Sequence, residues 1–256
     1  MKKAVICVSF GTTVDAARES ITAVENVLRE AAGDRLFVRA FTSPTVRRVL
    51  AERGETVPDV FGAMEDLKRQ GVRRVVAQPT LVVSGREYDE MRENVRMSRG
   101  DMEILTGDPL LADTADIKAL AVALSEEYPP CREETLVLFG HGTDHFANAV
   151  YPALQLAFQL AGREDVLVGT VEGWPAYEDV SRQLAGGGKR VHLVPLMLAA
   201  GDHVVRDMAG ADADSWASRL TAEGYTVRCT LRGLGMLPAV QAMYRAHLES
   251  KLRHGF

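Results

Sequence analysis

Short runs rich in valine, isoleucine and leucine alternate along this chain with longer segments in which apolar residues recur at helical spacing. This alternation is typical of βαβ units, in which buried strands run parallel and a helix connects each strand to the next. The runs predict eight strands, at residues 3–10, 36–41, 73–78, 101–106, 134–139, 165–171, 189–195 and 226–231. A closing helix is expected from residue 237 to about residue 251. We therefore expect an α/β fold with parallel sheets.

One pattern of residues occurs twice along the chain, and the two copies differ informatively at its end. In residues 78–87 and again in residues 194–203, a proline leads an apolar run to a glycine. Two positions beyond that glycine stands Glu87 in the first copy and His203 in the second. A duplicated half places equivalent positions on opposite sides of a cleft. Residues that differ at those positions are candidates for chemistry rather than for folding.

Three further stretches match between the halves. Residues 10–13 match 141–144, residues 41–44 match 172–175, and residues 107–111 match 233–237. Pro44 and Pro175 are then expected in the first turn of the following helix, where a missing N–H costs nothing. Any two doubly wound halves share an apolar pattern, but prolines and glycines in register are harder to obtain that way. We predict a pseudo-twofold repeat of two Rossmann-like or flavodoxin-like lobes, residues 1–133 and 134–256, with a cleft between them.

Composition and charge exclude several classes of protein. Apolar residues make up 46% and charged residues 25% of the 256, which is ordinary for a globular protein. A net charge of -5 argues against nucleic acid as a partner. No apolar run is long enough to span a bilayer, so no membrane is expected. The three cysteines form no C-x-x-C pair, which argues against a disulfide framework and fits a reducing cytoplasm.

Three residues of metal-ligand type follow three predicted strands of the second half. His141 comes after its first strand, Glu172 after the second and His203 after the third. Ligands of open α/β sheets bind beyond the carboxyl ends of the strands. Two imidazoles and a carboxylate suit a divalent ion such as Co²⁺, Ni²⁺, Fe²⁺ or Zn²⁺, and three ligands leave coordination positions open. Singly, each residue could be a turn cap or helix cap, but three at equivalent strand ends favour a metal site.

The first half carries Phe10, Phe41 and Glu87 at the corresponding points. Two aromatic rings and one carboxylate opposite three metal ligands suggest a flat organic partner. The alternative is that the two phenylalanines only end their strands in the core, as buried phenylalanine commonly does. Glu87 is harder to explain structurally, because a carboxylate in a loop kinked by glycine tends to be displayed toward a cleft.

These residues together resemble the class II tetrapyrrole chelatases, and among them the anaerobic-pathway cobaltochelatases that act on sirohydrochlorin. The resemblance runs through nearly the whole chain and is carried by residues 9–12, 85–88, 140–142, 171–172 and, most specifically, 192–203. It implies that His141, Glu172 and His203 hold the metal and that Glu87 is the first-half glutamate of the cleft. Trp174 stands where the family pattern often has another residue, which leaves the ligands unaffected.

The resemblance also implies a reaction. Co²⁺ would be inserted into sirohydrochlorin with release of two protons, in anaerobic cobalamin biosynthesis, without ATP or any cofactor beyond the substrate metal. Fe²⁺ or Ni²⁺ are alternative metals. His141 is the candidate general base, and His203 and Glu87 are the other candidate catalytic residues. Thr12, Thr13, Ser43 and Arg86 are candidate contacts for the substrate's carboxylates, and Phe10 and Phe41 for its ring.

Three alternatives stay open from the sequence. One is an iron chelatase acting toward sirohaem, since both metals use such ligands. Another is a carrier of tetrapyrrole or metal that does not catalyse, and the last is a structural metal site in an unrelated α/β protein. The expected partners are the small-molecule tetrapyrrole and the divalent metal, and a symmetric homo-oligomer is the usual expectation.

Overall fold

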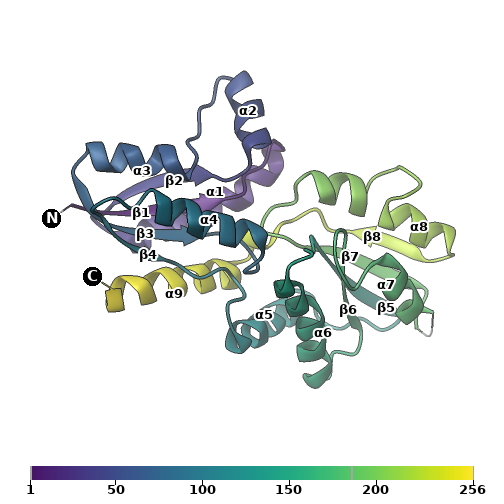
Figure 1. Cartoon of the computed structure of the whole chain (residues 1–256). Helices are drawn as coiled ribbons and strands as arrows, with labels where there is room; N and C mark the ends of the chain where they lie inside the picture. Colours follow the sequence, from purple (N-terminus) through teal and green to yellow (C-terminus); the bar gives the residue numbers. More distant parts are fainter. Residues whose placement is uncertain (1, 186, 256) are drawn as a thin grey trace. The chain divides into compact units, whose positions relative to one another are not determined.

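The computed structural model describes residues 2–185 and 187–255, and within them eight strands form two four-stranded parallel sheets (Figure 1). Every predicted strand is present, with its ends within two residues of the expected positions. The strands are β1 (Lys2–Ser9), β2 (Leu36–Phe41), β3 (Val72–Pro79), β4 (Glu103–Thr106), β5 (Glu134–Gly140), β6 (Val166–Thr170), β7 (Arg190–Leu196) and β8 (Thr226–Cys229). Their order is β2-β1-β3-β4 in one sheet and β6-β5-β7-β8 in the other, so the predicted fold of two similar α/β lobes is confirmed.

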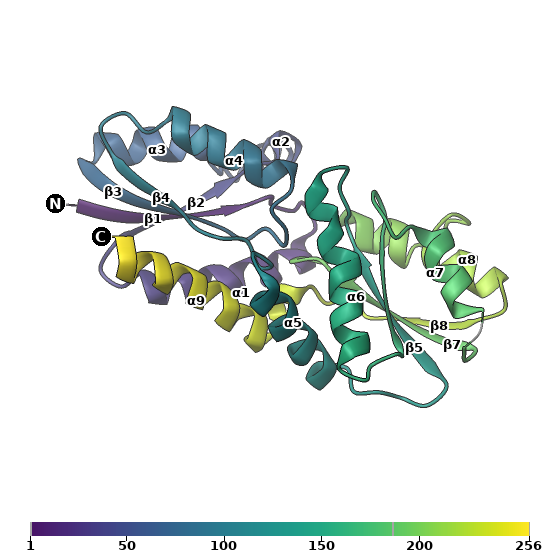
Figure 2. The ribbon, with the colours of Figure 1, turned by 60° about the horizontal axis from the view of Figure 1, so that its bottom comes forward.

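The first compact unit comprises residues 1–112 and 235–256. Two helices, α1 (Asp15–Ala32) and α9 (Pro238–Gly255), pack side by side on one face of its sheet (Figure 2). On the other face lie α3 (Val60–Arg69) and α4 (Arg86–Met97), whose apolar residues meet Ala4, Ile6 and Val8 of β1. A further helix, α2 (Pro44–Glu52), stands between β2 and α3.

The second unit comprises residues 113–234 and is built in the same way. Helices α5 (Thr114–Glu127) and α6 (Val150–Leu160) pack together on one face of its sheet, as Figure 2 shows. Helices α7 (Tyr177–Leu184) and α8 (Trp216–Ala222) contribute to the core on the other face. That core also contains Val204 and Met208 from a turn of π-helix that follows β7.

This division of the chain corrects the predicted boundary between residues 133 and 134. Helix α5 belongs to the second unit, because buried Arg163 holds its carboxyl end by donating to Tyr128 O at 3.0 Å while pairing with Asp165 at 2.8 Å. Helix α9 belongs to the first unit, where the hydroxyl of buried Tyr244 lies 2.8 Å from Thr80 O. A division read from the repeat alone could not detect that the last helix returns to the first sheet.

Helix starts follow the local sequence. The carboxylate of Asp113 accepts from the amides of Ala115 and Asp116 at 2.7 and 3.0 Å, and the Asp116 side chain accepts from the Asp113 amide at 3.3 Å. This reciprocal capping box begins α5 and with it the second unit. In the part of the chain that the structure describes, no helix combines the length and apolarity needed to cross a bilayer.

Main-chain hydrogen bonds identify equivalent positions in the two units. Ser43 N donates to Phe10 O at 3.3 Å in the first unit, and Glu172 N donates to His141 O at 2.8 Å in the second. Each bond joins the loop after the edge strand to the loop after the neighbouring central strand. Phe10 therefore matches His141, as predicted, whereas Glu172 matches Ser43.

The repeated glycine turn is also confirmed as an equivalent structure. The carbonyl of Gly85 accepts from the amides three and four residues further on, at 3.0 and 3.1 Å, and the carbonyl of Gly201 does the same at 3.0 Å for both. Each glycine thus begins a helical turn, with Glu87 or His203 as its second residue.

The match after the second strand of each half needs correction. Phe41 N donates to Pro58 O at 3.0 Å, and the equivalent bond runs from Thr170 N to Pro175 O at 2.7 Å. Phe41 therefore corresponds to Thr170 and not to Glu172, and Pro175 corresponds to Pro58 and not to Pro44. Pro44 begins α2 as predicted, but Pro175 precedes the N-cap of α7. Residues 42–57, which contain α2, take the place of residues 171–174.

The last predicted match is also displaced. Gly107 N donates to Ala77 O at 2.8 Å, and Thr230 N makes the equivalent bond to Leu193 O at 2.9 Å. Gly107 therefore corresponds to Thr230 rather than to Gly233. The two loops differ in length, and a comparison of glycines alone could not show this.

The tie between α5 and the second sheet can be tested through Arg163. Replacing Arg163 by alanine removes its two bonds to Asp165 and its bond to Tyr128 O, and we expect the free energy of unfolding to fall by about 2–3 kcal/mol. The control Arg92→Ala removes an exposed arginine that lies 3.9 Å from Asp89. It should change the free energy of unfolding by less than about 0.5 kcal/mol. Urea denaturation measures both, and equal effects would contradict the assigned role of Arg163.

His192 belongs to a polar network on β7. Its Nε2 lies 2.8 Å from Thr230 Oγ1 and 3.2 Å from Arg228 Nη1. Because a guanidinium can only donate, this nitrogen accepts the bond and is unprotonated. Glu134 holds the same guanidinium with two bonds of 2.9 and 2.6 Å. Burial, and after it the charge of Arg228, lower the pKa of His192 from 6.5 to about 4.

This depressed pKa predicts a dependence of stability on pH. Between pH 6.5 and about 4 the unfolded chain binds a proton at His192 that the folded chain does not, so acid favours unfolding. The contribution of neutral His192 is complete above pH 6.5 and is lost as the pH falls toward 4. Denaturation curves across this range should show a shallower loss of stability in His192→Gln than in the natural chain. An unchanged slope would contradict the assignment.

Candidate metal centre

The three predicted ligands lie on loops at the carboxyl ends of three adjacent strands, in the order β6, β5, β7. His141 directly follows β5, Glu172 follows β6, and His203 stands at the start of the helical turn after β7. The helices that follow β5 and β7 lie on opposite faces of the sheet, so the loops that lead to them diverge at this end. Such a switch point is where open α/β sheets bind ligands.

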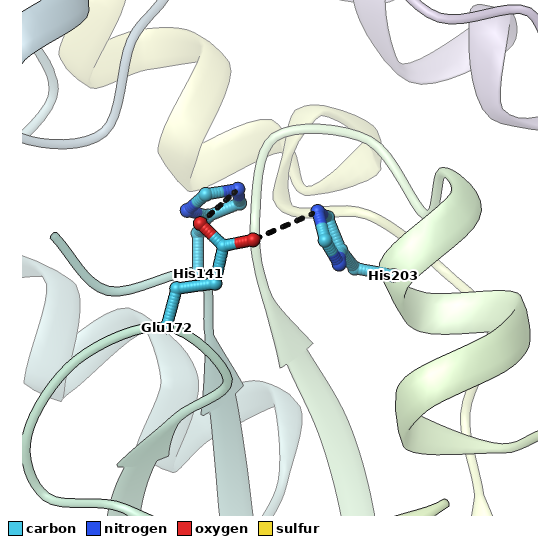
Figure 3. A group of neighbouring side chains, drawn as sticks. All are labelled: His141, Glu172 and His203. Atoms are coloured by element: carbon cyan, nitrogen blue, oxygen red, sulfur yellow. Dashed lines mark ion pairs between the residues drawn. The ribbon is translucent and has the colours of Figure 1, made fainter.

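Figure 3 shows the two imidazoles on either side of the Glu172 carboxylate. His141 Nε2 lies 3.8 Å from Glu172 Oε2, and His203 Nε2 lies 3.9 Å from Glu172 Oε1. The two rings are perpendicular, with centroids 4.8 Å apart. Side-chain exposures of 39%, 56% and 38% for His141, Glu172 and His203 leave the cluster open to solvent.

These distances fit a single ion. Metal bonds to imidazole nitrogen and carboxylate oxygen are about 2.0–2.2 Å long, so two ligands of one ion are at most about 4 Å apart. One ligand atom from each residue lies within 4.8 Å of the others, and small side-chain rotations would gather all three around one ion. Two imidazoles and one carboxylate suit divalent ions from iron to zinc.

The hydrogen bond at Nδ1 of each imidazole determines whether Nε2 is available to a metal. His141 Nδ1 lies 3.0 Å from the carbonyl oxygen of Gly142, and His203 Nδ1 lies 2.6 Å from Asp207 Oδ2. A carbonyl and a carboxylate can only accept, so both Nδ1 atoms carry the hydrogen. Both Nε2 lone pairs are then free on the side of Glu172.

Two glycines bring the His141 and Glu172 loops into contact. A Cβ at Gly142, whose φ is +84°, would lie 2.5 Å from Gly173 N, and a Cβ at Gly173 would lie 2.9 Å from Gly142 Cα. Asn148 then joins the loops, since its Oδ1 accepts from Thr143 N at 3.1 Å and its Nδ2 donates to Trp174 O. The spacing between the two ligands therefore depends on main-chain contact rather than on the ligands themselves.

Comparison with known proteins assigns the chain to a family. A family model described as Cobalt chelatase (CbiK) matches residues 3–253. The chain belongs to this family. This CbiK-family chain is 39% identical to the sirohydrochlorin cobaltochelatase of Salmonella typhimurium, over 98% of this chain and 97% of the relative. It is 31% identical to the sirohydrochlorin cobaltochelatase CbiKC of Nitratidesulfovibrio vulgaris, over 97% and 90%.

Solved structures of more distant proteins share the fold. SirB from Bacillus subtilis with Fe³⁺ has a TM-score of 0.69 at 17% identity, covering 100% of this chain and 99% of that one. The sirohydrochlorin chelatase SirB from Bacillus subtilis subspecies spizizenii, in complex with cobalt, has a TM-score of 0.67 at 15% identity, with the same coverage. Identities this low show the shared fold alone.

The predicted ring contacts of this CbiK-family chain differ in the structure. Phe41 is only 1% exposed and packs in the core of the first unit, so its prediction as a ring contact is wrong and the alternative of a core residue holds. Phe10 is 48% exposed and remains available. Glu87 is half-buried in the first turn of α4, and its predicted place at the metal stays a prediction.

The predicted carboxylate contacts have local roles. Ser43 caps α2 by accepting from Val46 N at 3.3 Å, and the buried Thr12 hydroxyl accepts from Val14 N at 3.2 Å. Thr13 is half-buried, and Arg86 is the exposed first residue of α4. Whether these residues contact a substrate stays a prediction.

Sequence reasoning missed Asp207 and Asn148. Asp207 could have been found, because a carboxylate four residues after a histidine lies beside it on a helical turn. Asn148 gave no comparable signal. Its two bonds depend on where the loop after β6 lies, and that loop follows a different strand.

The contact between the glycines predicts an effect on metal binding. In Gly173→Ala the new Cβ would lie 2.3 Å from Asn148 Oδ1 and 2.9 Å from Gly142 Cα, so the loops must separate. We expect Co²⁺ affinity, measured by calorimetry, to fall by about 10-fold or more. In Gly187→Ala the nearest atom is 3.6 Å away, and affinity should be unchanged. Natural affinity in Gly173→Ala would contradict this account of the spacing.

Proposed function

We propose that this chain is a sirohydrochlorin cobaltochelatase, which inserts Co²⁺ into sirohydrochlorin in anaerobic cobalamin biosynthesis. The observation that carries the proposal is the cluster of His141, Glu172 and His203, in which two imidazole nitrogens face one carboxylate. Membership of the cobalt chelatase family supports it. Two relatives that match almost the whole chain are named for this activity.

The reaction exchanges protons for a metal. Co²⁺ and the free-base macrocycle combine, two pyrrolic N–H bonds break, metal–nitrogen bonds form, and two protons leave. A suitable site must bind the ion and then release it to the ring. Three ligands leave coordination positions for incoming ring nitrogens. The solvent exposure of the cluster keeps it accessible to the incoming substrate.

The same site supplies a proton acceptor. An imidazole that gives up the metal can take a pyrrolic proton with the same nitrogen. We assign this step to His141, whose Nδ1 is held by a neutral main-chain carbonyl. Glu87 is proposed as a further proton acceptor or substrate contact, and His203 as the remaining catalytic residue. Holding the ion close to the ring makes the transfer effectively intramolecular.

The remaining features of the proposal concern partners and location. No ATP and no cofactor other than the substrate metal enter the balanced reaction. Sirohydrochlorin carries many carboxylates, and Phe10, Thr12, Thr13, Ser43 and Arg86 are proposed as its contacts in the first unit. We propose a cytoplasmic location and small-molecule partners only, without nucleic acid or membrane. A homo-oligomer remains an expectation from general frequency.

A second candidate function is insertion of Fe²⁺ into the same macrocycle. The observation that favours it is the ligand set itself, because two imidazoles and a carboxylate bind Fe²⁺, Co²⁺ and Ni²⁺ without strong selection. Competition between equal concentrations of Co²⁺ and Fe²⁺ under anaerobic conditions decides between them. Exclusive formation of the iron product would replace the cobalt assignment.

The activity is tested by following the absorbance of sirohydrochlorin with Co²⁺ and purified protein. Removing a metal ligand or general base should slow turnover on the order of 10²-fold or more in His141→Ala and in His203→Ala. His247→Ala removes an imidazole from α9, outside the cluster, and should retain natural activity within about twofold. If the natural chain metallates sirohydrochlorin no faster than the uncatalysed reaction, or completes only one turnover, it is not a catalyst. The alternative of a carrier would then hold.

A further inference from the structure

Among the described residues, the side chain of Asp207 contacts the Nδ1 atom of an imidazole in the candidate metal cluster. Within the described residues, His203 Nδ1 lies 2.6 Å from the carboxylate of Asp207. The corresponding nitrogen of His141 is held by a main-chain carbonyl instead. Only the His203 contact can therefore be removed by a substitution without changing the main chain.

The short hydrogen bond has two consequences for His203. It fixes the tautomer, because the carboxylate accepts and the hydrogen must stay on Nδ1. It also fixes the rotation of the ring, so that Nε2 remains 3.9 Å from Glu172 Oε1. Carboxylates that accept from a metal-binding imidazole also make it a better electron donor to the metal.

The helical turn that carries Asp207 is firmly anchored. Val204 and Met208 on either side of it are fully buried in the core of the second unit. The turn closes as π-helix, with Ala209 N donating to Val204 O at 3.1 Å. At its end Gly210 meets Arg206 O so closely that a Cβ there would lie 2.2 Å away. Widened turns of this kind occur frequently at functional sites.

We propose that Asp207 is a positioning residue, which holds the tautomer and orientation of His203 and thereby sets the affinity of the site for its metal substrate. The inference rests on the proposed function, because it concerns the same metal site. It adds a residue to that site which touches neither the metal nor the macrocycle.

A purely electrostatic role would be shared by Asp202. This carboxylate is one residue before His203 and lies 3.7 Å from Arg206 Nε, and it is more exposed than Asp207, at 65% against 45% of the side chain. Removing either aspartate removes one negative charge from the same turn. Only removal of Asp207 frees the imidazole, so Asp202→Ala is the matched control.

The test measures Co²⁺ binding without tetrapyrrole, by calorimetry and by the visible d–d absorption of bound Co²⁺. In Asp207→Ala we expect the dissociation constant to rise about 10- to 100-fold and the absorption spectrum to change. In Asp202→Ala we expect a rise of less than about threefold, since exposed charges are largely screened. Thermal unfolding of both variants should match the natural chain, because both side chains are substantially exposed.

Steady-state kinetics give a second measurement, which would not change if Asp207 had only a structural role. The KM for Co²⁺ should rise with the dissociation constant in Asp207→Ala, while the rate at saturating Co²⁺ falls by a smaller factor. Natural Co²⁺ affinity in Asp207→Ala, or equal weakening in both variants, would overturn the inference while leaving the proposed function intact. If the natural chain binds Co²⁺ but does not metallate sirohydrochlorin, the proposed function is wrong. The Co²⁺ affinities of the two variants would still test the role of Asp207.

Discussion

The candidate metal centre depends on a main-chain hydrogen bond, from Glu172 N to His141 O, that continues the pairing of two parallel strands beyond their ends. Parallel strands deliver their carboxyl ends to one edge of a sheet, but the loops that follow normally diverge toward their helices. Here the bond and the contact between Gly142 and Gly173 keep two loops together for two more residues. The carboxylate of Glu172 is thereby placed between imidazoles that reach the same edge from β5 and β7.

Much of this arrangement could be predicted from the sequence, because its causes are local or periodic. Apolar runs located all eight strands, and the loops that follow three of them gave His141, Glu172 and His203 as one cluster. What could not be predicted depends on contacts between distant segments. The return of α9 to the first sheet and the bridge made by Asn148 have no signature in the residues themselves.

The errors in matching the two halves have one physical origin. Prolines and glycines match positions that the main-chain hydrogen bonds do not make equivalent. Matching by these residues pairs Phe41 with Glu172 and predicts that it faces a ligand, although Phe41 ends its strand inside the core. Ser43 holds the equivalent place and uses its side chain to begin α2. The same backbone position thus presents a carboxylate in one unit and a helix cap in the other.

The loop after the edge strand is long in the first unit, residues 42–57, and short in the second, residues 171–174. This difference bears on where each unit can accept added residues. In the unit with the candidate metal site, residues 171–174 are held by the glycine contact and the asparagine bridge, so added residues after its edge strand would disturb these contacts. The other copy accommodated a helix at the same point. The two units therefore differ in how much added sequence the loop after the edge strand can hold. An engineered insertion is therefore best placed at α2 in the first unit. The positions of the candidate ligands, which lie in the second unit, do not depend on the length of that loop.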